Sequence, residues 1–169
     1  MSVASKSGEC YRKCFTLLQK CCQKLSLSLE IGTIHLDFEE RMHTVMREMF
    51  PEVVIKSCRL HLGQTWWRKI QNLDLAKEYK NYGSVISKWL THFFGLTFLE
   101  PSDVGNSFAE DLVLDMPDDK RIEQCSDYVL NTYIDDTTAT FPTSTWSEVP
   151  SLVRRTNNGP EAFHSHYNE

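Results

Sequence analysis

The stretch Ile31-Gly32-Thr33-Ile34-His35-Leu36-Asp37 predicts a short β-strand that ends at an acidic residue. A helix is expected to follow at once, because apolar residues recur there at helical spacing and a proline ends the run: Phe38, Met42, Val45, Met46, Met49 and Pro51. The β-branched residues 53–55 predict a second strand. This stretch therefore predicts a strand, a helix and a second strand in succession.

Residues 9–25, which precede this stretch, predict an amphipathic helix. Its apolar stripe consists of Cys10, Cys14, Leu17, Leu18, Cys21 and Leu25. With no signal peptide before them, these cysteines are expected to stay reduced and to pack as small buried residues. The order helix, strand, helix, strand favours a parallel sheet with helices packed on it, an α/β fold that is rich in helix.

The rest of the chain has an almost entirely helical pattern up to residue 135. Four helical segments are expected, around residues 66–70, 85–94, 104–112 and 122–133. Residues 136–153 are expected to be mainly loop, and residues 154–169 to form a turn that leads into a helix with Pro160 at its first position. Residues 1–8 are small and polar and predict a disordered N-terminus.

Composition limits the classes of function. The 169 residues are 41% hydrophobic and 24% charged, which is typical of one folded domain. The net charge of -5 argues against nucleic-acid binding by bulk charge and leaves a local basic patch open. No segment reaches the ~18 apolar residues of a membrane span, so neither a membrane partner nor export is expected. An intracellular location is the expectation.

Asp37 is the first candidate for chemistry, because ligands gather at the carboxyl ends of strands in open α/β sheets. A carboxylate at that place can bind a divalent cation. It can equally cap the helix expected to begin at Phe38, a role worth about 1 kcal/mol. Glu161 has the same two interpretations, since an acidic residue in the first turn of a helix also complements the helix dipole.

Two further patterns admit a ligand. Cys58 and His61 form a C-x-x-H pair with zinc-ligand residue types, although a structural zinc site needs four ligands and no second close pair is present. A helical turn with a buried Cys and a partnered His explains the pair as well. The basic pairs Arg68-Lys69 and Arg154-Arg155 could contact phosphate or simply be solvated.

Taken in order, a set of short motifs resembles the transposase domain of Mutator-like elements (MULEs). The matching residues are Asp37-Phe38-Glu39, Phe50-Pro51-Glu52, Cys58-x-x-His61, Trp67-Arg68-Lys69-Ile70-Gln71 and Arg155-Thr156-Asn157-Asn158-x-x-Glu161-x-x-His164. The resemblance runs from about residue 11 to the end of the chain. No single motif is very specific, and the ordered set carries the resemblance.

The resemblance implies a partial RNase H-like core over residues 9–57, with two parallel strands and flanking helices. An all-α insertion is implied over residues 58–135, and the last core helix is implied to begin within 154–169. Asp37 takes the place of the second carboxylate of a DDE triad and Glu161 that of the third. The implied cofactor is Mg²⁺ or Mn²⁺ rather than zinc, since these hard ions prefer oxygen ligands.

The resemblance also implies a partner and a place of action. The partner is DNA at transposon ends, with Arg154, Arg155, Asn157, Asn158 and His164 as candidate contacts, and the place is the nucleus. Cys58 and His61 match a family mark whose role the sequence does not give. Two parallel strands with unpaired edges also predict self-association or a partner.

One departure from the family changes the expected activity. The first Asp of the triad belongs on a strand upstream of residue 9, yet Asp37 is the first Asp of this chain. We therefore expect a fragment or remnant that does not cut DNA by itself. The alternative is a non-catalytic, transposase-derived module whose helical region binds DNA or protein; exposure of Trp66, Trp67, Trp89, Phe93 or Phe94 would favour it, although core positions are expected. A zinc module built on Cys58 and His61 is a third hypothesis.

Overall fold

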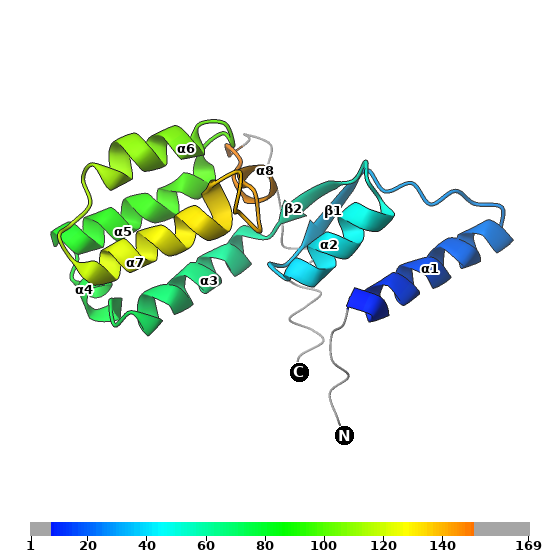
Figure 1. Ribbon diagram of the computed structural model, residues 1–169, viewed down its shortest axis with the longest axis horizontal. Coiled ribbons are helices and arrows are strands. Elements are labelled where there is room, and N and C mark those ends of the chain that lie inside the picture. Colours follow the sequence, from blue (N-terminus) through cyan, green and yellow to red (C-terminus); the bar gives the residue numbers. More distant parts are fainter. Residues whose placement is uncertain (1–7, 151–169) are drawn as a thin grey trace, which may run out of the picture.

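A pair of parallel strands forms the centre of the molecule in the computed structural model, which describes residues 8–150 (Figure 1). The strands β1 (Thr33–Leu36) and β2 (Val54–Ser57) pair in register, with Thr33 opposite Val54 and Leu36 opposite Ser57. Helix α2 (Glu40–Met49) connects them, as a parallel pair requires. The prediction of a helix-rich α/β fold with two parallel strands is confirmed.

Helix α2 covers the sheet with its apolar side. Its residues His43, Val45 and Met46 are buried, and Ile55 of β2 is buried as well. The α2 start differs from the prediction, because the helix begins at Glu40 rather than at Phe38. The residues between β1 and α2 thus form a short connection, on which Asp37 lies.

Helix α1 (Gly8–Lys24) packs against α2 from the side away from the bulk of the molecule (Figure 1). The rings of Phe15 and Phe50 meet edge to face with centroids 5.8 Å apart. Arg12 Nη2 lies 2.6 Å from Glu48 Oε2. Both contacts hold α1 at the C-terminal end of α2.

The prediction that the α1 cysteines are buried is wrong. The helix has no fully buried residue, and Cys10, Cys14 and Cys21 are exposed together with Leu17, Leu18 and Leu25. The helix turns toward α2 the side that carries Tyr11, Phe15 and Cys22, which are half-buried. This side adds the ring contact of Phe15 with Phe50 and the hydrogen bond of Tyr11 to Glu39, neither of which the leucines and thiols could make.

The chain after β2 forms a helical unit. It contains α3 (Arg59–Asn72), α4 (Ala76–Lys80), α5 (Val85–Gly95), α6 (Val104–Ser107), α7 (Lys120–Val129) and α8 (Thr143–Trp146). A 3₁₀ turn, Leu96–Phe98, follows α5, and π-helical turns continue α6 over Phe108–Val113 and α7 over Leu130–Ile134. The helices expected from periodicity are therefore present.

An aromatic cluster fills the centre of the helical unit. The Trp66 ring contacts Phe93 at a centroid distance of 4.9 Å and Trp146 at 5.7 Å. Trp66, Trp89 and Phe93 are buried, whereas Trp67 and Phe94 are half-buried against the same core. The expectation that these five aromatic residues serve the core is confirmed.

The segment expected to be a loop after residue 135 contains one turn of helix, α8. Trp146 at its end is buried, and its Nε1 donates hydrogen bonds to the carbonyl oxygens of Tyr133 (3.2 Å) and Phe141 (3.1 Å). Lys56 of β2 donates to the Ser144 carbonyl at 3.1 Å. This segment thus returns to the sheet and links it to the helical unit.

Candidate functional site

The carboxyl ends of the two strands bring the candidate residues together. Asp37 follows β1 directly and Cys58 follows β2 directly. Because the strands are parallel and Leu36 lies opposite Ser57, both chains leave the sheet at the same edge. The Cys58 N–H donates to the Leu36 carbonyl oxygen at 3.2 Å, which extends the ladder to this edge.

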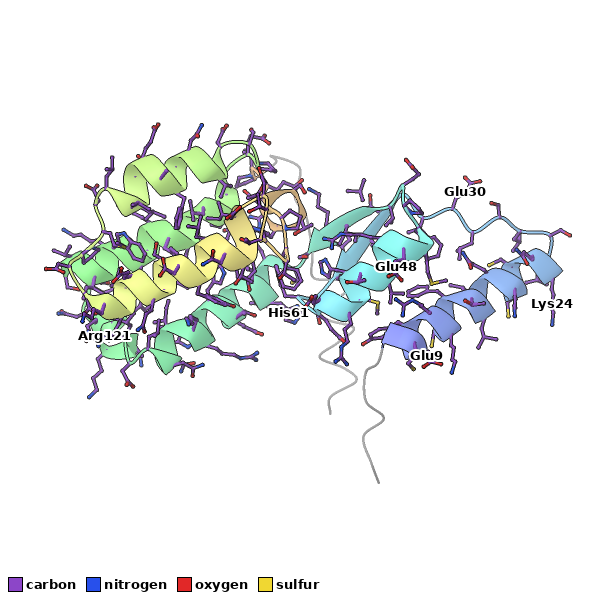
Figure 2. All side chains as sticks on the ribbon, in the orientation of Figure 1. Glu9, Lys24, Glu30, Glu48, His61 and Arg121 are labelled. Carbon is purple, nitrogen blue, oxygen red and sulfur yellow. The ribbon has the colours of Figure 1, made fainter. Side chains whose placement is uncertain are left out.

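Asp37 and His61 form the central contact of this edge. His61 lies in the first turn of α3, and its Nδ1 is 2.7 Å from Asp37 Oδ1. Both side chains remain accessible, with 67% exposure for Asp37 and 41% for His61. Figure 2 labels His61 at the junction between the sheet and the helical unit. The two groups thus lie within ion-pair distance, without the alignment of a hydrogen bond at Nδ1.

Two hydrogen bonds hold the backbone carbonyl group of Asp37 in place. Its carbonyl oxygen accepts the Glu39 N–H at 2.8 Å and lies 2.9 Å from Nε2 of the buried His43. Nε2 therefore carries the proton that is donated, and His43 Nδ1 has no partner among residues 8–150. Burial lowers the pKa of His43 below its usual value, so the ring is held neutral.

The expected helix cap at Asp37 is not formed. The residue before α2 is Glu39, and no side chain at that position accepts a hydrogen bond from the first turn. The Asp37 carboxylate instead reaches across to α3 and His61. Its position at the carboxyl end of β1 is as predicted.

The three residues of the D-F-E motif point to three different places. Asp37 meets His61. Phe38 enters the helical unit, where its ring lies 5.1 Å from Phe141 between centroids. Glu39 accepts the Tyr11 hydroxyl from α1, at 3.0 Å from each carboxylate oxygen. The motif therefore joins the strand edge, the helical unit and α1.

Tyr11 and His43 were not among the residues selected from the sequence. Burial, with the Glu39 carboxylate beside it, raises the pKa of the Tyr11 hydroxyl above its usual value. His43 is buried in α2 together with Val45 and Met46. A histidine within the apolar pattern of the expected helix could have identified it as a buried polar residue. Tyr11 contacts Glu39 and His43 contacts the Asp37 carbonyl oxygen, so both residues hold the connection between β1 and α2.

Within the described residues, Cys58 and His61 gather no further ligands for a metal site. Cys58 is half-buried at the position before α3, and the imidazole of His61 is held by Asp37. Within residues 8–150, no group of three His, Cys, Asp or Glu side chains is placed to hold a metal ion. The described residues at this edge offer one carboxylate, which does not fit a two-ion cluster by itself.

The remaining candidate residues lie in residues 151–169, outside the part of the chain that the structure describes. They are Glu161, Arg154, Arg155, Asn157, Asn158 and His164. The predicted convergence of Asp37 and Glu161 therefore remains a prediction.

Charge is distributed unevenly along the molecule. Residues 8–24, which form α1, contain four Lys or Arg and one Glu, a net charge of +3. Residues 59–150, which form the helical unit, contain eight Lys or Arg and fourteen Asp or Glu, a net charge of -6. A phosphate backbone is repelled by the second surface and attracted by the first.

No protein-family model, curated protein or solved structure matches the chain. Among residues 8–150, none of the helices combines the length and the apolar character that crossing a bilayer demands. The geometry of the strand edge is thus the basis for assigning a function.

Proposed function

We propose that this chain derives from the catalytic domain of a MULE-type transposase, with Asp37 as the second carboxylate of the DDE triad. The observation that supports the proposal is the 2.7 Å contact between Asp37 and His61. These residues belong to two separate motifs of the resemblance, D-F-E and C-x-x-H. A common site explains why both motifs occur in one chain.

The proposal assigns β1, α2 and β2 to part of an RNase H-like core and the helical unit to the insertion of that family. Two features support this assignment. The strands are parallel with a helix between them. The helical unit begins directly after β2 and has its own aromatic core, as an inserted unit requires.

The proposed ancestral chemistry is DNA cleavage and strand transfer, for which two divalent ions held by carboxylates supply the activation of the attacking and leaving oxygens. Residues 1–36 contain no Asp, so the chain itself supplies at most Asp37 and Glu161 of the three acids. We therefore expect the chain of 169 residues to be catalytically incomplete. Asp37 keeps an exposed carboxylate beside His61, at which an ion can bind weakly.

Manganese binding tests the role of Asp37. Titration of the full chain with Mn²⁺ is expected to broaden the NMR signals of Asp37 and its neighbours first, because a bound paramagnetic ion relaxes nearby nuclei. Asp37→Asn should abolish this site-specific broadening, whereas Asp103→Asn, an exposed acid before α6, should leave it unchanged. Equal broadening in Asp37→Asn and the parent chain would contradict the assignment of Asp37.

A cleavage assay tests the incompleteness separately. With Mg²⁺ or Mn²⁺ and duplex DNA, the chain is expected to release no more product than Asp37→Asn does. Robust cutting that the Asp37→Asn change removes would show a complete active site. Such a result would overturn the remnant interpretation and leave the transposase ancestry standing.

The second candidate function is a non-catalytic binding module. The aromatic residues that could have formed its surface are used by the core, and the helical unit is acidic. A protein partner with basic residues therefore suits the helical unit better than DNA does. Fluorescence anisotropy with labelled duplex DNA at low salt separates the two: submicromolar binding would favour a DNA-binding module, which would then act in the nucleus.

A further inference from the structure

The outer side of α1 is an apolar surface that no part of residues 8–150 covers. We call it the α1 stripe and define it by Cys14, Leu17, Leu18, Cys21 and Leu25. Leu17 is 62% exposed, Leu18 45% and Leu25 71%, and both cysteines are exposed. A contiguous exposed apolar patch of this kind marks an interaction site.

The α1 stripe is accessible to a second helix. Each residue turns the helix by about 100°, so residues 14, 17 and 21 lie about 105° around the axis from Tyr11, Phe15 and Cys22, which face α2. A helix laid on the stripe therefore passes α2 without meeting it. Figure 1 shows α1 at the end of the molecule, with the helical unit at the opposite end.

The spacing of the stripe indicates the shape of its partner. Positions 10, 14, 17 and 21 are separated by four, three and four residues, the alternation of a heptad seam. A seam this narrow fits one other helix. The small cysteine side chains at 14 and 21 permit a close approach of the two backbones.

The flanks of the stripe indicate which helix fits and in which direction. Lys13 and Lys20 lie along one flank, and Leu18 and Leu25 lie along the other. In a parallel pair of identical helices, each lysine flank meets the leucine flank of the other copy, and the aliphatic stems cover the leucines. An antiparallel pair sets Lys13 against Lys20, which is repulsive.

We propose that the α1 stripe is a homodimer interface, in which α1 of two copies pair as a parallel coiled coil. The seam then places Cys14, Leu17 and Cys21 of one copy against the same residues of the other, as a two-fold axis requires. The inference is independent of the proposed transposase ancestry.

Sedimentation equilibrium of the full reduced chain tests the dimer. A concentration-dependent dimer is expected, and Leu17→Lys should weaken it about 100-fold or more, because two buried leucines are lost. Gln23→Lys adds the same charge on the side of α1 away from the stripe and should leave the dimer unchanged. Circular dichroism of both variants checks that the fold is intact.

Disulfide formation tests the direction of the pair. Diamide oxidises two thiols to one disulfide while it is itself reduced to the hydrazine. A chain whose only cysteine is Cys14 should cross-link to a dimer, since Cys14 faces itself in the parallel pair. A chain whose only cysteine is Cys22, which lies toward α2, should cross-link at least tenfold more slowly.

Three outcomes would overturn the proposal. A chain that is monomeric at all concentrations has no homodimer interface at the stripe. A dimer that survives Leu17→Lys has its interface elsewhere. A dimer that Leu17→Lys disrupts but in which Cys14 does not cross-link has antiparallel helices.

Discussion

The His43 imidazole supports Asp37 from inside the molecule, with Nε2 2.9 Å from the Asp37 carbonyl oxygen. The ring also meets Phe141 of the helical unit edge to face at a centroid distance of 5.0 Å. One buried side chain of α2 therefore contacts both the strand edge and the helical unit. The protonation of this ring affects the stability of both.

His43 is expected to make the folded state sensitive to mild acid. Burial, aided by the charge of Arg47 and opposed by the hydrogen bond to Asp37, lowers the pKa of His43 below its usual value of 6.5. The unfolded chain then binds more protons below pH 6.5, so the free energy of unfolding falls as the pH drops from 6.5 toward the pKa of the folded state. Above pH 6.5 the neutral His43 ring makes its full contribution to the free energy of unfolding.

Urea unfolding of His43→Gln checks this expectation. The variant should be less stable at about pH 7.5 but should lose less stability than the parent between about pH 7.5 and about pH 5.5. His92→Gln, a change at an exposed histidine of α5, serves as the control and should keep the parent pH dependence. An identical slope in His43→Gln and the parent would contradict the role of His43.

Trp66 is expected to be the most costly residue of the helical unit to truncate. Its buried ring contacts Phe93, Phe94, Tyr133 and Trp146. Trp66→Ala should lower the free energy of unfolding by about 3–5 kcal/mol, because a large cavity remains. Leu114→Ala, at a 77% exposed leucine, should cost under about 0.5 kcal/mol. Chemical denaturation followed by circular dichroism measures both, and equal costs would contradict the core position.

Arg121 joins α4 to the start of α7. Its guanidinium lies 2.7 Å from Asp119 and 2.8 Å from Glu78, and it donates to the Asp74 carbonyl oxygen. Arg121→Met is expected to lower the midpoint of thermal unfolding by a few degrees, and Lys120→Met, at the exposed neighbour, by less. Hydrogen bonds from Arg121 lower the pKa of Asp119. A backbone hydrogen bond, followed by the hydrogen bond from Arg121, lowers the pKa of Glu78.

The contribution of Arg121 to the free energy of unfolding should therefore be fully present above the ordinary carboxyl pKa values. It should be lost as the pH falls through the lowered pKa values of Asp119 and Glu78. Thermal unfolding at a series of acidic pH values tests this. The difference between the parent and Arg121→Met should shrink as the pH falls below about 4. A difference that stays constant would mean that the carboxylates are not involved.

Helix α1 is expected to detach before the rest of the molecule unfolds. Its docking depends on the ring contact of Phe15 with Phe50 and on the polar contacts of Tyr11 and Arg12 with α2 and the residue before it. In hydrogen exchange at low protein concentration, Phe15→Ala should speed the exchange of α1 amides about tenfold and leave α5 and α7 unchanged. Lys20→Ala, an exposed change on α1, should have no such effect. Uniform acceleration across the chain would show that α1 unfolds together with the core.

Cys125 is expected to be the protected thiol. It is buried on α7, and burial raises its pKa to about 11, so little thiolate is available for reaction. At a protein concentration low enough to keep the chain monomeric, native-state labelling with a disulfide reagent should modify the exposed Cys14 and Cys21 rapidly and Cys125 only after denaturant is added. Rapid labelling of Cys125 without denaturant would indicate frequent opening of the helical unit.

The strands and the main helices could be predicted from local periodicity, and the parallel pairing from the order strand, helix, strand. The connection of Asp37 with His61 was available in principle, since residues that follow neighbouring parallel strands share one edge. A partnered His61 was one interpretation of the C-x-x-H pair, but the sequence analysis did not name Asp37 as that partner. The π-helical turns after α6 and α7 have no local signal of this kind.

Periodicity failed for α1 because the helix has two apolar sides. Cys14, Leu17 and Cys21 mark one side, and Tyr11 and Phe15 mark the other. A pattern shows that a side can be buried and does not show which side meets a neighbour. The turn at α8 was missed for a related reason, since its Thr and Ser residues are typical of loops while only Trp146 anchors it.

The separation of charge between α1 and the helical unit gives the described part of the molecule an electric dipole along its long axis. In the field of a polyanion, such a dipole experiences a torque that turns the positive end forward. The protein would then approach end-on, with α1 leading and the acidic helices trailing. Added salt would remove this alignment, because screening acts over about 10 Å at 0.1 M.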